Sequence, residues 1–324
     1  TRCSRDWSSD VCSSDLDWYA SSDRGLVREE NEDSLLLVVP EDTAVVGDKG
    51  VLAVVADGVG GGVGGKIASI TAVARVGESY FASERGFIPA LVEAMREADR
   101  EIVAKADRDP SCRGMATTCT AFLLHGYDGY LCHVGDSRAY LFRDGILRQI
   151  TEDHTLVGRL LADGLITTEA AARHPQKNVI VQALGSGREP SPDTFHVNLE
   201  NGDVILLCSD GLHGLVSGED IASRLSSLPT RDAGESLMER AKEMGGADNI
   251  TIIILKLAGK NPSADQGRKP FSQSASGERD RKRNALIGAI LVALVCGGFF
   301  FLWTRHEFVA KKPPDLGDVI RVSK

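Results

Sequence analysis

Acidic residues recur beside glycines at the ends of the strand-like apolar runs in this sequence. They are Glu32, Asp33, Asp57, Asp136, Asp210 and Asp248. A single Asp next to a Gly is usually a turn former. Repetition at the ends of paired antiparallel strands is different, because those ends meet and the gathered negative charge must be neutralised. The pattern therefore predicts a cation site.

Oxygen ligands in this number, with no His or Cys cluster beside them, suit Mg²⁺ or Mn²⁺ better than Zn²⁺ or copper. Two such ions held close together lower the pKa of a shared water and clamp a phosphoryl oxygen for in-line attack. This chemistry favours hydrolysis of a phosphate monoester without an activated Ser or Cys nucleophile. A nearby Arg would bind the dianionic phosphate through paired N–H donors.

The elements that must position these acids alternate between strand-like and helix-like stretches over residues 17–258. Strands are expected at 35–39, 51–56, 117–124, 130–134, 139–142, 204–208 and 250–257. Hairpin turns are expected at 125–129 and at Asp144-Gly145. Amphipathic helices are expected over 66–81 and 88–103. Local strand pairing with separate pairs of helices predicts an α+β layered domain and disfavours a doubly wound parallel sheet.

The two ends of the chain differ in character from this domain. Residues 1–16 lack periodicity and are expected to be a non-native or disordered leader. Residues 259–284 are rich in Gly, Pro, Ser and charge, which predicts a flexible basic linker. Residues 285–303 carry no charge over about 19 positions and predict one transmembrane helix, followed by a short tail, 304–324, outside the cytoplasm.

Basic residues crowd the N-terminal side of the predicted span. Arg281, Lys282 and Arg283 lie there, whereas the far side is less basic near the membrane. The positive-inside rule then places the catalytic domain in the cytoplasm, held at the inner membrane by a single span. The formal net charge of -9 argues against nucleic acid as a partner.

Five ordered motifs follow an opening motif at residues 22–34 and resemble those of the bacterial type 2C, or PPM, protein Ser/Thr phosphatases. The later motifs are Ala56-Asp57-Gly58-Val59-Gly60-Gly61, Gly114-Met115-Ala116-Thr117-Thr118, His133-Val134-Gly135-Asp136-Ser137-Arg138, Ser209-Asp210-Gly211-Leu212 and Asp248-Asn249-Ile250-Thr251. The resemblance covers nearly all of residues 17–257. It implies an αββα sandwich of two antiparallel sheets flanked by helices, with a flap within residues 151–188.

The resemblance also implies a role for each acid. Asp57 would bridge two Mn²⁺ or Mg²⁺ ions, and the Gly58 carbonyl would be a further ligand. Asp210 and Asp248 would complete the first ion, and Glu32 and Asp33 would serve the second, partly through water. Arg28 would bind the substrate phosphate. A third, weaker ion would lie between Asp136 and Asp210. The implied partners are phosphorylated proteins, including a Ser/Thr kinase and its substrates.

Three positions depart from the family pattern. Family members usually have His or Met where this chain has Val59, commonly His at Gly62, and often Glu at Lys66. Val59 cannot donate a proton, so a general acid at that position is excluded. Either a metal-bound water or His154 would take that role, and the alternative for His154 is a flap residue without a chemical role.

Three competing hypotheses use other residues. Gly60 to Lys66 nearly matches a phosphate-binding loop or a dinucleotide fingerprint, but Ile67 replaces the required Ser or Thr and the hairpins oppose a parallel sheet. Cys132 and Arg138 have the spacing of a tyrosine phosphatase loop, but a strand follows them where a helix is needed. The third is a catalytically inert, membrane-tethered regulatory or phosphoprotein-binding module of the same fold. The retained acids disfavour it, because like charges repel without a cation.

Overall fold

The computed structural model describes residues 16–40, 48–59, 63–167, 170–171 and 173–258. Two antiparallel sheets of five strands each dominate these residues. The first has the order β1 (Leu16–Asp23), β12 (Ile250–Leu257), β11 (Val204–Cys208), β8 (Arg138–Arg143) and β9 (Ile146–Gln149). The second has the order β10 (Asp193–Asn198), β7 (Asp128–Val134), β6 (Cys119–His125), β3 (Val51–Ala56) and β2 (Ser34–Val38). A short ladder pairs β4 (Gly58–Val59) with β5 (Ala116–Thr117).

The central strand β3 shows why the sheets stack and why each is also covered on its outer side. All six of its residues are buried. Because side chains alternate along a strand, Val51, Ala53 and Val55 join the core between the two sheets. Its other three residues join the core beneath the helices. β12 divides its side chains between two cores in the same way.

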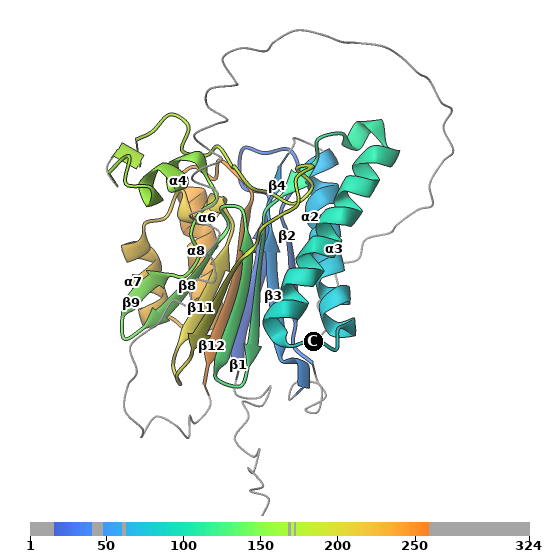
Figure 1. Cartoon of the computed structure of the whole chain (residues 1–324). Coiled ribbons are helices and arrows are strands. Elements are labelled where there is room, and N and C mark those ends of the chain that lie inside the picture. The colour runs from blue at the N-terminus through green and yellow to red at the C-terminus, as the bar shows by residue number, and fades with distance from the viewer. Residues whose placement is uncertain (1–15, 41–47, 60–62, 168–169, 172, 259–324) are drawn as a thin grey trace, which may run out of the picture. The chain divides into compact units, whose positions relative to one another are not determined.

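Helices cover the outer face of each sheet (Figure 1). The long pair α2 (Val63–Ala82) and α3 (Phe87–Arg108) packs on the second sheet. On the first sheet lie α6 (Asp210–His213), α7 (Gly218–Ser227) and α8 (Thr230–Glu243). The short elements η2 (Pro110–Cys112) and α4 (Leu156–Ala162) complete the set. The structure therefore confirms two antiparallel sheets with flanking helices.

Several boundaries differ from the expectations. β1 begins at Leu16, one residue before the expected start of the domain, and Leu16 is buried opposite Leu257. Neither β1 nor β10 was expected as a strand. α2 and α3 each extend beyond the expected ranges at both ends.

The predicted linker, membrane span and tail, residues 259–324, lie outside the described residues, as does the leader up to residue 15. Among the helices that the structure describes, none has the length and apolar character needed to cross a bilayer.

Candidate active site

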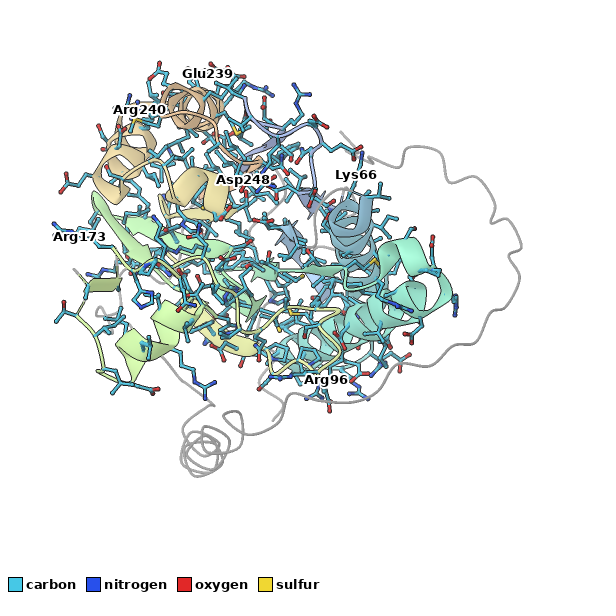
Figure 2. The ribbon with its side chains drawn as sticks, turned by 90° about the horizontal axis from the view of Figure 1, so that it is seen from above. Lys66, Arg96, Arg173, Glu239, Arg240 and Asp248 are labelled. Atoms are coloured by element: carbon cyan, nitrogen blue, oxygen red, sulfur yellow. The ribbon has the colours of Figure 1, made fainter. Side chains whose placement is uncertain are left out.

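The predicted acids lie at one end of the sandwich, because antiparallel pairing brings strand ends together. Ser34, which follows Asp33, pairs with Ala56, which precedes Asp57. Cys208 at the end of β11 pairs with Ile252 near the start of β12, so Asp210 and Asp248 also belong to this end. Figure 2 looks onto it and shows Asp248 near the middle of the face, with Lys66 on the α2 side.

Electrostatic effects among the buried acids indicate that these residues lie near one another. Burial raises the pKa of Asp57 well above its ordinary value, and the charges of Asp33, Asp210, Asp136 and Asp248 raise it further. Burial, with the nearby Asp210 charge adding, raises the pKa of Asp33 and that of Asp136 to about 7 each. Burial also raises the pKa of Asp210. These carboxyls are held where their charged forms are costly without a counter-charge.

Unpartnered oxygens indicate what that counter-charge is. Within the described part of the chain, Asp33 Oδ1, Asp136 Oδ1 and Asp210 Oδ1 are buried without a hydrogen-bond partner. Buried carboxylate oxygens normally have partners. Divalent cations that prefer oxygen would satisfy them, so the donor set fits Mg²⁺ or Mn²⁺.

The predicted metal ligands lie at this end of the sandwich, but their side chains do not surround a common position. Over the described ranges, no three His, Cys, Asp or Glu side chains are disposed to hold one ion. Arg28 Nη2 lies 2.7 Å from Asp248 Oδ2. The hydrogen bond to Asp248 raises the pKa of Arg28 despite partial burial. Arg28, predicted to bind phosphate, is therefore paired with Asp248, a predicted metal ligand. If Asp248 bound a metal ion, Arg28 would have to share this carboxylate with the ion or release it.

The family is decided by comparison with known proteins. A model of protein phosphatase 2C matches residues 29–248, which include Asp57, Asp136, Asp210 and Asp248. The chain belongs to the protein phosphatase 2C family.

Named relatives agree with this assignment. The serine/threonine protein phosphatase PstP of Mycobacterium tuberculosis is 39% identical over 300 residues, which cover 92% of this chain and 54% of the relative. This chain thus spans about half the length of that relative. The serine/threonine phosphatase stp of Listeria monocytogenes is 34% identical over 241 residues, 72% of this chain and 93% of the relative.

Solved structures of family members have the same fold. The phosphatase PstP/Ppp of Mycobacterium tuberculosis superposes with a TM-score of 0.67 at 38% identity, covering 75% of this chain and 99% of that structure. The PstP catalytic domain in complex with two manganese ions gives a TM-score of 0.65 at 36% identity, with the same coverage.

In this family member, Asn249 holds the loop that carries Arg28 and Glu32. Its Nδ2 donates to the carbonyls of Arg24 and Glu30, at 2.9 Å each, and its Oδ1 accepts from the Glu32 backbone N–H at 2.8 Å. No role was predicted for Asn249 from the sequence. The only indication in the sequence is the residue type. An Asn amide has two N–H donors and one carbonyl acceptor, so it can bind several backbone groups of a loop at once.

Hydroxyls position two of the acids. Ser209 Oγ donates to Asp33 Oδ2 at 2.7 Å and accepts from the Thr251 N–H at 3.0 Å, so it joins three of the motifs. Thr118 Oγ1 accepts from the Asp57 N–H at 2.9 Å, and Thr117 Oγ1 donates to the Asp57 carbonyl at 2.8 Å. The backbone of Asp57 is therefore fixed by the last residue of β5 and the residue that follows it.

The glycine-rich stretch serves close packing. A Cβ on Gly58 would lie 2.3 Å from the Gly65 carbonyl oxygen, and one on Gly65 would lie 2.3 Å from Glu32 Oε2. Glycine at these positions lets the first turn of α2 approach both the predicted carbonyl ligand and Glu32. β3 pairs antiparallel with both of its neighbours, so the parallel sheet required by a nucleotide-binding loop is absent from the strands that the structure describes.

The tyrosine phosphatase alternative fails on geometry. Cys132 is fully buried in β7, and burial raises the pKa of its thiol well above the ordinary value. Arg138 makes three hydrogen bonds to the carboxylate of Asp153, at 2.6 to 3.1 Å. Neither the thiolate nor the free guanidinium of that mechanism is present.

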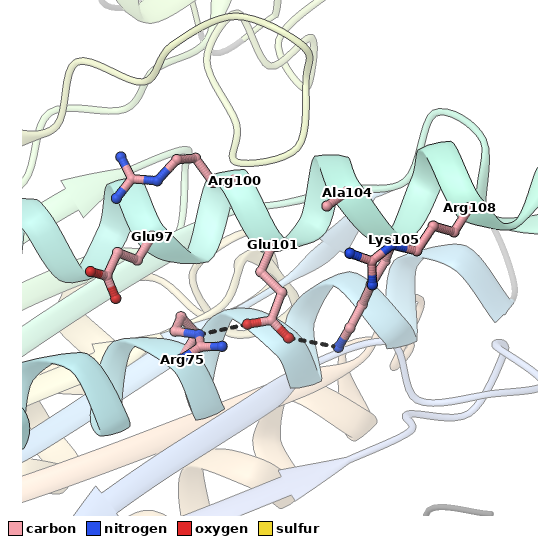
Figure 3. Close-up of a pocket in the computed structure, with 7 residues that line it drawn as sticks. All are labelled: Arg75, Glu97, Arg100, Glu101, Ala104, Lys105 and Arg108. Carbon is pink, nitrogen blue, oxygen red and sulfur yellow. Dashed lines mark hydrogen bonds and ion pairs between the residues drawn. The ribbon is translucent and has the colours of Figure 1, made fainter. Parts of the chain in front are cut away.

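A cavity of about 530 Å³ lies on α2 and α3, away from the acids (Figure 3). Its cations are largely engaged within the pair of helices: Arg75 Nε lies 2.5 Å and Lys105 Nζ 3.2 Å from the Glu101 carboxylate. None of the predicted site residues lines it. This cavity is therefore separate from the predicted site residues.

Proposed function

We propose that this domain is a metal-dependent phosphatase that hydrolyses phosphoserine and phosphothreonine in proteins and so reverses Ser/Thr kinase signalling. The observation that carries the proposal is the set of buried acids with raised pKa values and unpartnered oxygens at one end of the sheets. Two Mn²⁺ or Mg²⁺ ions held there would supply an activated water and offset the charge of the phosphate.

The residues divide the work as follows. Asp57 would hold both ions, and the Gly58 carbonyl would be a further ligand. Asp210 and Asp248 would complete the first ion. Glu32 and Asp33 would serve the second ion, partly through water. Arg28, half exposed on its loop, would leave Asp248 to bind the substrate phosphate. A third, weaker ion between Asp136 and Asp210 is supported by the raised pKa of both carboxyls.

The proposed setting is the cytoplasmic face of the inner membrane, with one span over residues 285–303. It is supported by the uncharged run and its basic N-terminal flank. Phosphorylated proteins, including a Ser/Thr kinase and its substrates, are the proposed partners.

Asp210→Asn tests the proposal. We expect at least about a hundredfold lower kcat/KM on a phosphothreonine peptide with Mn²⁺, because losing a direct ligand should cost no less than the roughly 10- to 100-fold loss typical of the groups that orient such ligands. Asp232→Asn, at an exposed position of α8, is the matched control and should leave activity unchanged. Cys132→Ser should also retain activity.

Three results would contradict the proposal. Turnover that persists in excess chelator would exclude metal dependence, and loss of activity in Cys132→Ser alone would restore the thiolate mechanism. A folded wild-type chain that binds Mn²⁺ but hydrolyses no phosphopeptide would favour the inert regulatory module.

A further inference from the structure

His154 uses both ring nitrogens in contacts that the proposed chemistry does not explain. Its Nδ1 accepts from the Gly135 N–H at 3.2 Å and from Gln182 Nε2 at 3.0 Å. The proton of the neutral ring is therefore on Nε2, which lies 3.1 Å from Asp193 Oδ2. In addition, the His154 N–H donates to the Gly135 carbonyl at 2.7 Å. Both backbone groups of Gly135 are thus bound by one residue.

Gly135 precedes Asp136, and the turn they form is held by contacts on each side. Gly135 has a φ of +113°, and a Cβ there would lie 2.5 Å from Thr118 Cβ. His213 Nε2 donates to the Asp136 carbonyl at 3.0 Å. Ser137 Oγ and Thr118 Oγ1 lie 2.7 Å apart. Asp136 Oδ1 is buried and has no hydrogen-bond partner within the described residues, so the turn holds a carboxylate oxygen that a cation could satisfy.

His154 also closes the base of the segment 155–181, which includes α4. The Val181 N–H donates to the His154 carbonyl at 2.8 Å, and the Leu156 N–H donates to the Val179 carbonyl at 2.8 Å. Thr155 and Ile180 form an isolated antiparallel bridge. The two ends of the segment therefore meet at His154, the residue that also binds Gly135.

We propose that His154 is a positioning residue that couples the segment 155–181 to the carboxylate of Asp136. When the two ends of the segment are paired at His154, the Nδ1 atom of His154 accepts from the Gly135 N–H and fixes the Gly135–Asp136 turn. Asp193 accepts from Nε2 and so keeps the imidazole in the tautomer whose Nδ1 is an acceptor. Displacement of the segment would free the turn and weaken cation binding at Asp136. The inference rests on the proposed function, because it concerns the weakest of the proposed ions.

Two substitutions at this position separate the role of Nδ1 from that of side-chain size. An Asn side chain can place an oxygen near the position of Nδ1, whereas Gln reaches the position of Nε2. We expect His154→Gln to weaken the lowest-affinity Mn²⁺ site about tenfold, with the two tighter sites unchanged. His154→Asn should restore that affinity to within about threefold. The measurement is calorimetric titration of the full 324-residue chain with Mn²⁺.

A second pair of variants removes the partner of the ring and leaves His154 in place. Asp193 and Asp128 are carboxylates with 45% exposed side chains, and each is paired with a His Nε2. Asp193→Ala should weaken the lowest-affinity site roughly threefold. Asp128→Ala, whose partner His196 lies on β10 away from the acids, should leave all Mn²⁺ sites unchanged. These exposed positions keep the test valid if His154→Gln fails to fold.

Activity at limiting and saturating Mn²⁺ gives the second readout. His154→Gln should lose activity at limiting Mn²⁺ and recover it when the ion is raised, as a purely structural defect would not. Equal weak-site affinity in wild type, His154→Gln and Asp193→Ala overturns the coupling. So does a wild-type chain that hydrolyses phosphopeptide while binding only two ions, and that result leaves the proposed function standing. A wild-type chain that binds no Mn²⁺ overturns both.

Discussion

At the scale of single residues, polar side chains that touch neither ion nor substrate decide where the acids lie. Asn249 is 4% exposed, and all three of its amide hydrogen bonds reach backbone groups of the loop around Arg28. A net contribution of about 1 kcal/mol for each hydrogen bond gives roughly 3 kcal/mol for holding this loop. Other contacts also hold the loop, among them the Leu26 N–H donating to the Gly246 carbonyl and Ser69 Oγ donating to the Glu32 carbonyl.

Asn249→Ala should therefore impair substrate binding. With Arg28 no longer held at the site, we expect KM for a phosphopeptide to rise about tenfold, because hydrogen bonds worth roughly 1 to 2 kcal/mol of positioning are lost. Asn249→Asp keeps the acceptor for the Glu32 N–H but places a buried carboxylate oxygen against the Arg24 and Glu30 carbonyls, so KM should rise at least as much as in Asn249→Ala. Steady-state kinetics at saturating Mn²⁺ measure this, with Asn198→Ala at the exposed end of β10 as control. A KM unchanged in Asn249→Ala would show that the loop is held by other contacts.

The limits of prediction are visible at these same residues. Asp57 and Asp210 could be found because each follows an apolar run and precedes glycine, a local pattern. Asn249 and Ser209 could not, because their partners lie 217 and 176 residues away in the chain. No local sequence pattern around either residue predicts which group it will contact. The acids are visible in the sequence, whereas the groups that orient them depend on the completed fold.

At the scale of elements, the strands that were predicted are those that contain a run of apolar residues. β3 and most of β12 are apolar because one face packs on the other sheet and one on helices. The edge strand β2 is only partly buried but was predicted, because Leu35 to Val38 are all apolar. β1 and β10 were missed because they also lie at sheet edges, most of their positions are only partly buried, and neither has such a run. Edge strands need few apolar residues, so their periodicity is weak.

The start of α2 gives a test at this scale. Gly65→Ala would place a methyl group 2.3 Å from Glu32 Oε2 and 3.0 Å from the Gly58 carbonyl carbon. Helix propensity favours Ala over Gly by about 1 kcal/mol. Overpacking against fixed backbone costs about 1 to 3 kcal/mol, so we expect net destabilisation and weaker Mn²⁺ binding. Thermal unfolding with and without Mn²⁺ measures both.

Gly64→Ala is the matched control on the same helical turn. Its nearest contact would be Met115 Cβ at 3.3 Å, a side-chain atom that can move slightly. The gain in helix propensity should offset this contact, leaving stability within about 1 kcal/mol of wild type. If both variants unfold at the same temperature and bind Mn²⁺ equally, close approach of α2 to Gly58 is not what shapes the site.

At the scale of the whole molecule, the buried acids make stability depend on pH and metal together. Asp33 and Asp136 have pKa values of about 7 in the fold and about 4 when unfolded. The unfolded chain therefore releases these protons first, and metal-free stability falls as pH rises through about 7. Two buried histidines act oppositely at lower pH: burial lowers the pKa of His133 to about 3 and that of His213 to about 4. Their contribution is nearly complete only at about pH 7.5, so between pH 6.5 and 8 it offsets part of the loss from the acids.

We expect the metal-free chain to lose on the order of 1 kcal/mol, or a few degrees in Tm, between pH 6.5 and 8. With saturating Mn²⁺ the loss should disappear, because cations bind the carboxylate forms and no longer compete with protons at pH 8. Asp136→Asn removes one of the titrating groups, so its metal-free Tm should fall by less than that of wild type over this range. Asp232→Asn should behave as wild type. A metal-free Tm that stays level or rises from pH 6.5 to 8 would contradict this prediction. It would mean that groups within the protein already neutralise the acids, and such a site would not need divalent ions.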